Sequence, residues 1–112
     1  MNSLTSEISF HNSKLFFSRI ELNKILACYS LGVSRGNWKD YAINFRKNEA
    51  IFFIFKNSFA TPHCILTKSV KNKKNKFIYD LNIGNIKKNN FNKIDDLLIF
   101  LKRKNFKLLN LN

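Results

Sequence analysis

Hydrophobic residues recur with a helical period in the first third of the chain. The residues spaced at intervals of three and four are Leu22, Ile25, Leu26, Tyr29 and Val33. The run before them, Ser18 to Glu21, has the spacing of a capping box, in which each side chain accepts a hydrogen bond from the other residue's backbone amide. This pattern predicts a helix over residues 18–35 with one apolar face. Gly32 and Gly36 are suitable residues to end it.

The hydrophobic period changes from 3.6 to 2 after Trp38. Tyr41, Ile43 and Phe45 alternate with small or polar residues, which is typical of a half-buried strand, and the continuous apolar run that follows predicts a central strand over residues 50–56. The turn at residues 47–49 leaves two registers open. A two-residue turn places Phe52 and Ile54 on the face of Ile43, whereas a three-residue turn places Ile51, Phe53 and Phe55 there.

The second half of the chain has shorter apolar segments separated by polar ones. Residues 63–70 and 77–83 predict two further strands around a basic loop at 71–76. Ile86, Lys87 and Lys88 could add a short edge strand whose lysines discourage edge-to-edge pairing.

A second helix follows, with Asn92 as its cap. Asp95 and Asp96 in its first turn and the basic run 102–104 at its end match the helix dipole. Its predicted apolar face consists of Ile94, Leu97, Leu98 and Leu101.

These elements predict an α+β fold: an N-terminal helix, a four- or five-stranded antiparallel meander and a C-terminal helix. The length suits one domain, so we expect a flexible N-terminus at residues 1–9 and a single domain at 10–112. No secretory signal is evident, and the longest apolar run, residues 50–55, is far shorter than the ~20 residues that span a membrane. Two cysteines are too few for a disulfide framework. We therefore expect a soluble, cytoplasmic protein with no membrane contact.

The net charge of the chain indicates more about its function than any sequence motif does. Twenty Lys and Arg residues against seven Asp and Glu give a net charge of +13, and residues 71–112 hold eleven of the bases but three of the acids. If the basic segments share one side of the fold, they form a patch suited to binding phosphates, and we expect the partner to be RNA or a ribonucleoprotein. The alternative is a dispersed, solvated rim, with part of the charge due to the codon bias of an AT-rich genome. The candidate residues are Lys71, Lys73, Lys74, Lys76, Lys87, Lys88, Lys102, Arg103 and Lys104.

The junction between the first helix and the first strand holds a dense group of functional side chains, Trp38, Lys39, Asp40 and Tyr41. As a binding site, Trp38 would stack on a ring and Asp40 would accept a hydrogen bond from the ligand. As plain structure, Trp38 would cover the end of the core, and Asp40 would bond turn amides or pair with Arg35 or Lys39. We favour the structural interpretation.

Catalysis finds little support in the sequence. No nucleophile elbow or phosphate-cradling glycine loop is present. The Cys and His residues lack the spaced pairs of zinc sites, so we expect no enzyme, no metal and no cofactor.

The hypothesis that competes with polyanion binding is a protein-interaction or regulatory subunit. If both helices cover one face of the sheet, phenylalanines such as Phe52 or Phe53 lie on the other face, where they could stack bases, hold a protein partner or form a homodimer. If one helix covers each face, no such surface exists.

The run Arg19, Glu21-Leu22, Ile25-Leu26, Tyr29, Gly36 and Trp38 to Ile43, followed by the strand at 50–55 and by Pro62 to Lys68, resembles a known family. It is similar to the small alphaproteobacterial proteins grouped as domain of unknown function 2794, over about Phe17 to Leu109. Cys64 and Leu66 depart from the family's tyrosine and isoleucine. The resemblance implies a cytoplasmic, alphaproteobacterial protein and no particular activity. It also implies that the basic charge is more than codon bias, because similar members are basic through arginine.

Overall fold

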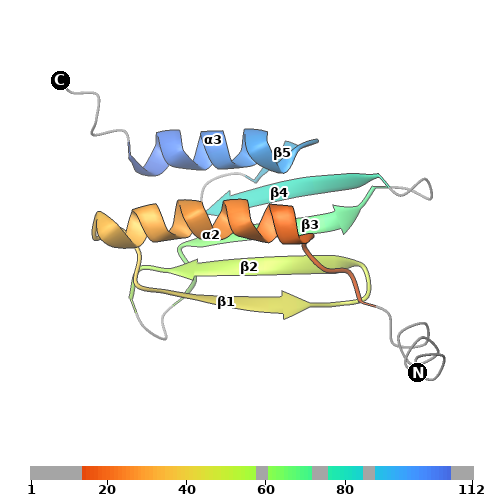
Figure 1. The fold of residues 1–112 in the computed structure, drawn as a ribbon, viewed down its shortest axis with the longest axis horizontal. Coiled ribbons are helices and arrows are strands. Elements are labelled where there is room, and N and C mark those ends of the chain that lie inside the picture. The colour runs from red at the N-terminus through yellow and green to blue at the C-terminus, as the bar shows by residue number, and fades with distance from the viewer. Residues whose placement is uncertain (1–13, 58–60, 72–75, 85–87, 107–112) are drawn as a thin grey trace.

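The computed structural model describes residues 14–57, 61–71, 76–84 and 88–106 (Figure 1). Its elements, in chain order, are α2 (Arg19–Ser34), β1 (Asp40–Phe45), β2 (Glu49–Phe55), β3 (Cys64–Val70), β4 (Phe77–Ile83), β5 (Asn89–Phe91) and α3 (Ile94–Asn105). In this part of the chain the predicted α+β order of helix, antiparallel meander and helix is confirmed, with five strands. The N-terminal segment 1–9, which we expect to be flexible, lies outside the described residues.

The sheet is an antiparallel meander in the order β1-β2-β3-β4-β5. Ile43 lies opposite Phe52, and Tyr41 lies opposite Ile54. The turn between these strands consists of two residues, Lys47 and Asn48, closed by a 2.8 Å bond from the Arg46 amide to the Glu49 carbonyl. Of the two registers left open by the sequence, the structure therefore has the one that puts Phe52 and Ile54 on the face of Ile43.

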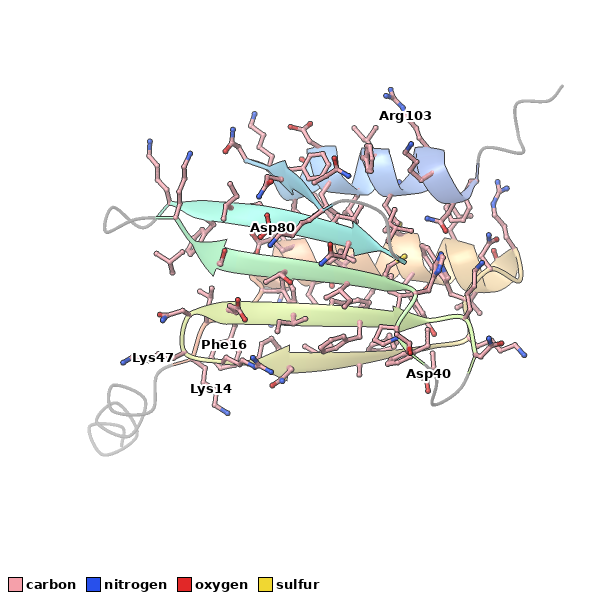
Figure 2. The ribbon with its side chains drawn as sticks, turned by 180° about the vertical axis from the view of Figure 1, so that it is seen from behind. Lys14, Phe16, Asp40, Lys47, Asp80 and Arg103 are labelled. Carbon is pink, nitrogen blue, oxygen red and sulfur yellow. The ribbon has the colours of Figure 1, made fainter. Side chains whose placement is uncertain are left out.

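Both helices pack against the same face of the sheet (Figure 1). One core cluster unites buried residues of both helices and of three strands, namely Ile25, Cys28, Phe52, Ile54, Leu66, Leu81, Leu97 and Leu101, among others. Because side chains alternate along a strand, the residues between these core positions point to the opposite face. No described helix lies on that opposite face (Figure 2), so the arrangement with one helix on each face is excluded for this part of the chain.

The start of α2 is as predicted. The Ser18 amide donates to Glu21 Oε1 at 2.8 Å, and the Glu21 amide donates to Ser18 Oγ at 3.0 Å, which completes the capping box. Gly36 follows the helix with a φ of +79°, a conformation that glycine adopts without strain.

Two predictions for α2 are wrong. Gly32 does not end the helix but lies inside it, packed against the indole ring of Trp38. Val33 is 42% exposed, because the buried stripe continues through Cys28 and Gly32.

The predicted positions of β5 and of the second helix cap also need correction. The edge strand is Asn89–Phe91, and Lys88 precedes it, whereas Ile86 and Lys87 lie outside the described residues. Phe91 anchors the strand by packing on Phe100 of α3, with ring centroids 5.5 Å apart. The cap residue of α3 is Lys93 instead of Asn92, and no side chain caps this end.

Candidate functional site

The structure buries Trp38 in the core beneath the two helices. Its side chain is 1% exposed, and its indole stacks nearly parallel to the ring of Tyr29 at 6.3 Å and lies 5.7 Å from that of Phe106. Its Nε1 atom has no hydrogen-bond partner among the described residues. An indole so enclosed has no open face for a ligand, so this geometry supports the structural interpretation of Trp38.

The other members of this corner have local structural roles. The Lys39 amide donates to the Phe55 carbonyl at 2.9 Å, and Asp40 Oδ1 accepts a 2.8 Å bond from the Tyr41 amide. Tyr41 stacks on Phe52 with ring centroids 5.0 Å apart. Asp40 forms no ion pair with Arg35 or Lys39 in the described structure, so the backbone bond is its observed role.

The predicted basic loop lies at one end of the sheet. Lys71 follows β3 and Lys76 precedes β4; both are exposed, and their backbones are joined by a 2.7 Å bond. The turn between β1 and β2 brings Arg46 and Lys47 to the same end (Figure 2). Lys73 and Lys74 lie outside the described residues.

Lys102, Arg103 and Lys104 lie at the opposite end of the molecule. Figure 2 shows Arg103 there, across the sheet from Lys14 and Lys47. Strands of seven residues, about 20 Å long, separate this end from Lys71 and Lys76.

Lys88 lies between these ends, at the sheet edge, with its Nζ 3.9 Å from Asp80 Oδ2. Lys87 is outside the described residues. The described members of the predicted patch thus form separate groups and not one surface.

The α3 end gathers further bases that the sequence did not reveal. Arg35 lies over the Phe106 ring at 5.0 Å, and the bond from Lys39 to Phe55 places Lys39 beside Lys56. These residues come together because α2, β2 and α3 all end here while β3 begins here. We call this group the helix-end surface: Arg35, Lys39, Lys56, His63, Lys102, Arg103 and Lys104.

A pocket opens on the helix-end surface. It has a volume of about 440 Å³ and is lined by Lys56, Asn57, Thr61, Pro62, His63 and Gly84. Burial and the positive charge of Lys56 lower the pKa of His63, although a hydrogen bond with Asn105 opposes this effect. His63 is therefore neutral near pH 7, and the pocket combines one cationic amine with neutral hydrogen-bonding groups.

Lys68, Glu21 and Tyr79 form a buried polar network that the sequence did not reveal. Lys68 Nζ donates to Glu21 Oε1 at 2.8 Å and to the Phe16 carbonyl at 2.9 Å, and the Tyr79 hydroxyl donates to Glu21 Oε2. Burial raises the pKa of Glu21, but the bonds from Lys68, Tyr79 and Ser18 outweigh it and lower that pKa overall. Since Glu21 also caps α2, the network fastens the start of the helix to the sheet.

The two cysteines are buried under the helices and are not disulfide-bonded. Burial raises the pKa of the Cys28 thiol to about 11 and that of the Cys64 thiol to about 12. Both thiols are therefore protonated near neutral pH, and neither is an activated nucleophile.

The uncovered face of the sheet is a second candidate surface. Phe53, not Phe52, lies on it; Phe52 is fully buried under the helices. We call this surface the bare sheet face and define it by its apolar centre: Ile51, Phe53, Phe55, Ile65 and Ile78.

These features define a small two-layer α+β domain, a five-stranded antiparallel meander covered on one face by two helices. Nowhere in the described structure is a helix long and apolar enough to cross a bilayer. Residues 15–97 match the model of the family described as "Protein of unknown function (DUF2794)", and the chain belongs to this family. No curated protein and no solved structure matches the chain.

Proposed function

We propose that this protein is a non-enzymatic, cytoplasmic domain that binds a polyanion, RNA or a ribonucleoprotein, through the helix-end surface. The observation that carries the proposal is the convergence of six Lys and Arg residues at one end of the described structure, from the ends of α2, β2 and α3 and the start of β1. None of its six Lys and Arg side chains forms an ion pair with a described carboxylate. Like charges held close together repel one another, and a bound phosphate chain relieves that repulsion while releasing its own counterions.

The pocket supplies the groups that contact one phosphate. Lys56 offers a charge-assisted donor, and Thr61 and Asn57 offer a hydroxyl and an amide. The bases around the pocket would hold the neighbouring phosphates of the same strand.

The described chemistry favours binding over catalysis. Both thiols are buried and protonated, and the hydrogen-bond partner of His63 is an amide, not a carboxylate that would activate it. The two free thiols also agree with a reducing compartment such as the cytoplasm.

Salt-dependent binding of a labelled single-stranded RNA tests the proposal. A triple variant, Lys39→Gln/Lys56→Gln/Lys104→Gln, removes three charges from the helix-end surface. A matched variant, Lys47→Gln/Lys71→Gln/Lys76→Gln, removes three from the opposite end. Fluorescence anisotropy is measured from about 50 mM to about 200 mM salt.

We expect the helix-end variant to bind at least about tenfold more weakly and its salt slope to fall by about 2, since each phosphate contact on a single strand contributes about 0.7. The matched variant should change affinity by less than about threefold. Equal losses in both variants would refute the helix-end location. Wild-type binding that is absent at low salt, or independent of salt, would refute polyanion binding altogether.

A further inference from the structure

The bare sheet face is more apolar than a solvent-facing surface requires. Ile51 is only 7% exposed although it lies outside the helix-covered core cluster. Phe53, Phe55, Ile65 and Ile78 are half-buried, with no described helix over them. When one face of an antiparallel sheet is exposed to water, the side chains on that face are usually polar. A continuous apolar centre on such a face therefore marks a contact surface.

The charge of this face differs from that of the rest of the molecule. Although the chain carries a net charge of +13, the described strands themselves place no Lys or Arg on this face. Its bases lie just beyond the strand ends: Arg46 and Lys88 beside its carboxylates, and Lys71 and Lys76 at its rim. The outward residues besides the apolar centre are Asp40, Ala42, Asn44, Glu49, Thr67, Ser69, Asp80, Asn82 and Asn90.

The three carboxylates of the face have local partners. Asp80 accepts a 2.5 Å bond from Asn90 and lies near Lys88, Glu49 lies 4.0 Å from Arg46, and Asp40 bonds the Tyr41 amide. Arg46 and Lys88 offset the charges of Glu49 and Asp80, so the positive and negative charges of the face nearly cancel. The face therefore offers no single sign of charge to a strongly acidic or strongly basic protein.

A second copy of this chain fits such a face. Two neutral apolar faces can meet without opposing the bases, which lie at the ends of the sheet and on the helical layer. We propose that the bare sheet face packs against the same face of a second copy, giving a symmetric dimer with four layers: helices, sheet, sheet and helices. Sheets that pack in this way lie about 10 Å apart with their strands within about 30° of each other.

The extent of the face corresponds to a small interface. Strands β1 to β4 lie about 4.8 Å apart and are each about 20 Å long, so the face covers about 400 Å² in projection. A standard interface buries roughly 800 Å² on each partner, so a dimer formed through this face belongs to the smaller interfaces.

The test is the mass of the full chain in solution, measured by light scattering after nuclease treatment and at high salt, so that bound RNA cannot bridge two copies. Thr67→Arg is the informative variant. Thr67 lies between Ile51 and Asp80 on the face, so an arginine there can pair with Asp80 in a monomer but would be buried against its symmetry mate in the dimer. Ser30→Arg, on the exposed side of α2, adds the same charge elsewhere.

We expect the wild type and Ser30→Arg to have twice the chain mass of 13.2 kDa and Thr67→Arg to have the single mass. Ala42→Arg, at an exposed position on the same face, with Ala27→Arg on α2 as its control, repeats the test if Thr67→Arg does not fold. A wild type that remains monomeric at about 100 μM, or a folded face variant that dimerises as well as its control, would overturn the proposal.

The result is independent of RNA binding, because the helix-end surface lies outside this face. A folded monomeric Thr67→Arg variant should bind RNA at each helix-end surface as the wild type does. A dimer that binds no RNA would refute the proposed function alone, and a monomer that binds RNA would refute the dimer alone.

Discussion

The indole ring of Trp38 occupies the space in which a side chain at Gly32 would lie. A Cβ atom added to Gly32 would be 2.1 Å from Trp38 Cε3 and 2.6 Å from Cζ3. Gly32 is buried within α2, so the close approach of helix and indole depends on the missing side chain. This contact explains why a glycine stands inside a helix, where it is otherwise less favourable than alanine by about 1 kcal/mol.

Gly32→Ala should therefore destabilise the protein, although alanine favours the helix. Overpacking in a rigid core costs about 1–3 kcal/mol, which exceeds the gain in helix propensity. We expect a net loss of about 2 kcal/mol in the free energy of unfolding, measured by urea denaturation.

A double-mutant cycle provides the control for this contact. In a Trp38→Leu background the clash is relieved, so Gly32→Ala should have little effect or be stabilising. An equal loss in both backgrounds would show that the indole is not the cause.

Removal of the buried Lys68 amine should lower the free energy of unfolding far more than removal of an exposed lysine amine. The Lys68 and Glu21 side chains are 6% and 13% exposed, whereas Lys24 and Asp95, an ion pair with the same 2.8 Å distance, are 45% and 55% exposed. Lys68→Met leaves a buried carboxylate unpaired and should lower the free energy of unfolding by about 3 kcal/mol. Lys24→Met should lower it by no more than about 0.5 kcal/mol.

The double variant Glu21→Gln/Lys68→Met distinguishes loss of the pair from loss of packing. Because no unpaired charge remains, it should be more stable than Lys68→Met. If it is less stable than either single variant, the ion pair is not the source of the effect.

Glu21 should also make stability depend on acid pH. The pKa of this carboxyl is lower in the folded protein than its ordinary value of 4.5. Its contribution is therefore fully present above that ordinary value and is lost as the pH falls through the folded-state pKa. Urea unfolding at a series of pH values should show a decline below about pH 4.5 that is shallower in Glu21→Gln. Identical slopes in the two proteins would contradict this assignment.

Neither cysteine should react with thiol reagents in the native protein. Cys28 and Cys64 are 2% and 0% exposed, and burial raises both pKa values above the ordinary 9.0. Dithiobisnitrobenzoate at neutral pH should label both thiols in urea and label them in the native state only as fast as the protein opens. Rapid native labelling of either thiol would show that the helices do not cover it.

Local patterns were sufficient to predict the order of elements and the capping box of α2. These features depend on residues a few positions apart, whose periodicity and hydrogen bonding are the same in any tertiary context. The exact bounds of β5 and the cap residue of α3 were predicted less accurately, because neighbouring residues carry similar local signals. Ile86, Lys87 and Lys88 suggested an edge strand, and Asn92 suggested a helix cap. The strand is instead Asn89–Phe91, where Phe91 packs on Phe100, and the cap residue is Lys93.

The sequence by itself determined the helix–meander–helix order, the family and an excess of basic residues. Only the tertiary structure decided where that charge lies. Lys71 and Lys102 belong to the same basic third of the chain, yet the length of β3 separates them. Arg35, Lys39 and Lys56, from distant positions, come to the end of the molecule at which α3 ends. The structure also placed both helices on one face and left Phe53 uncovered. Both outcomes depend on which segments pack together, and periodicity along the chain does not contain that information.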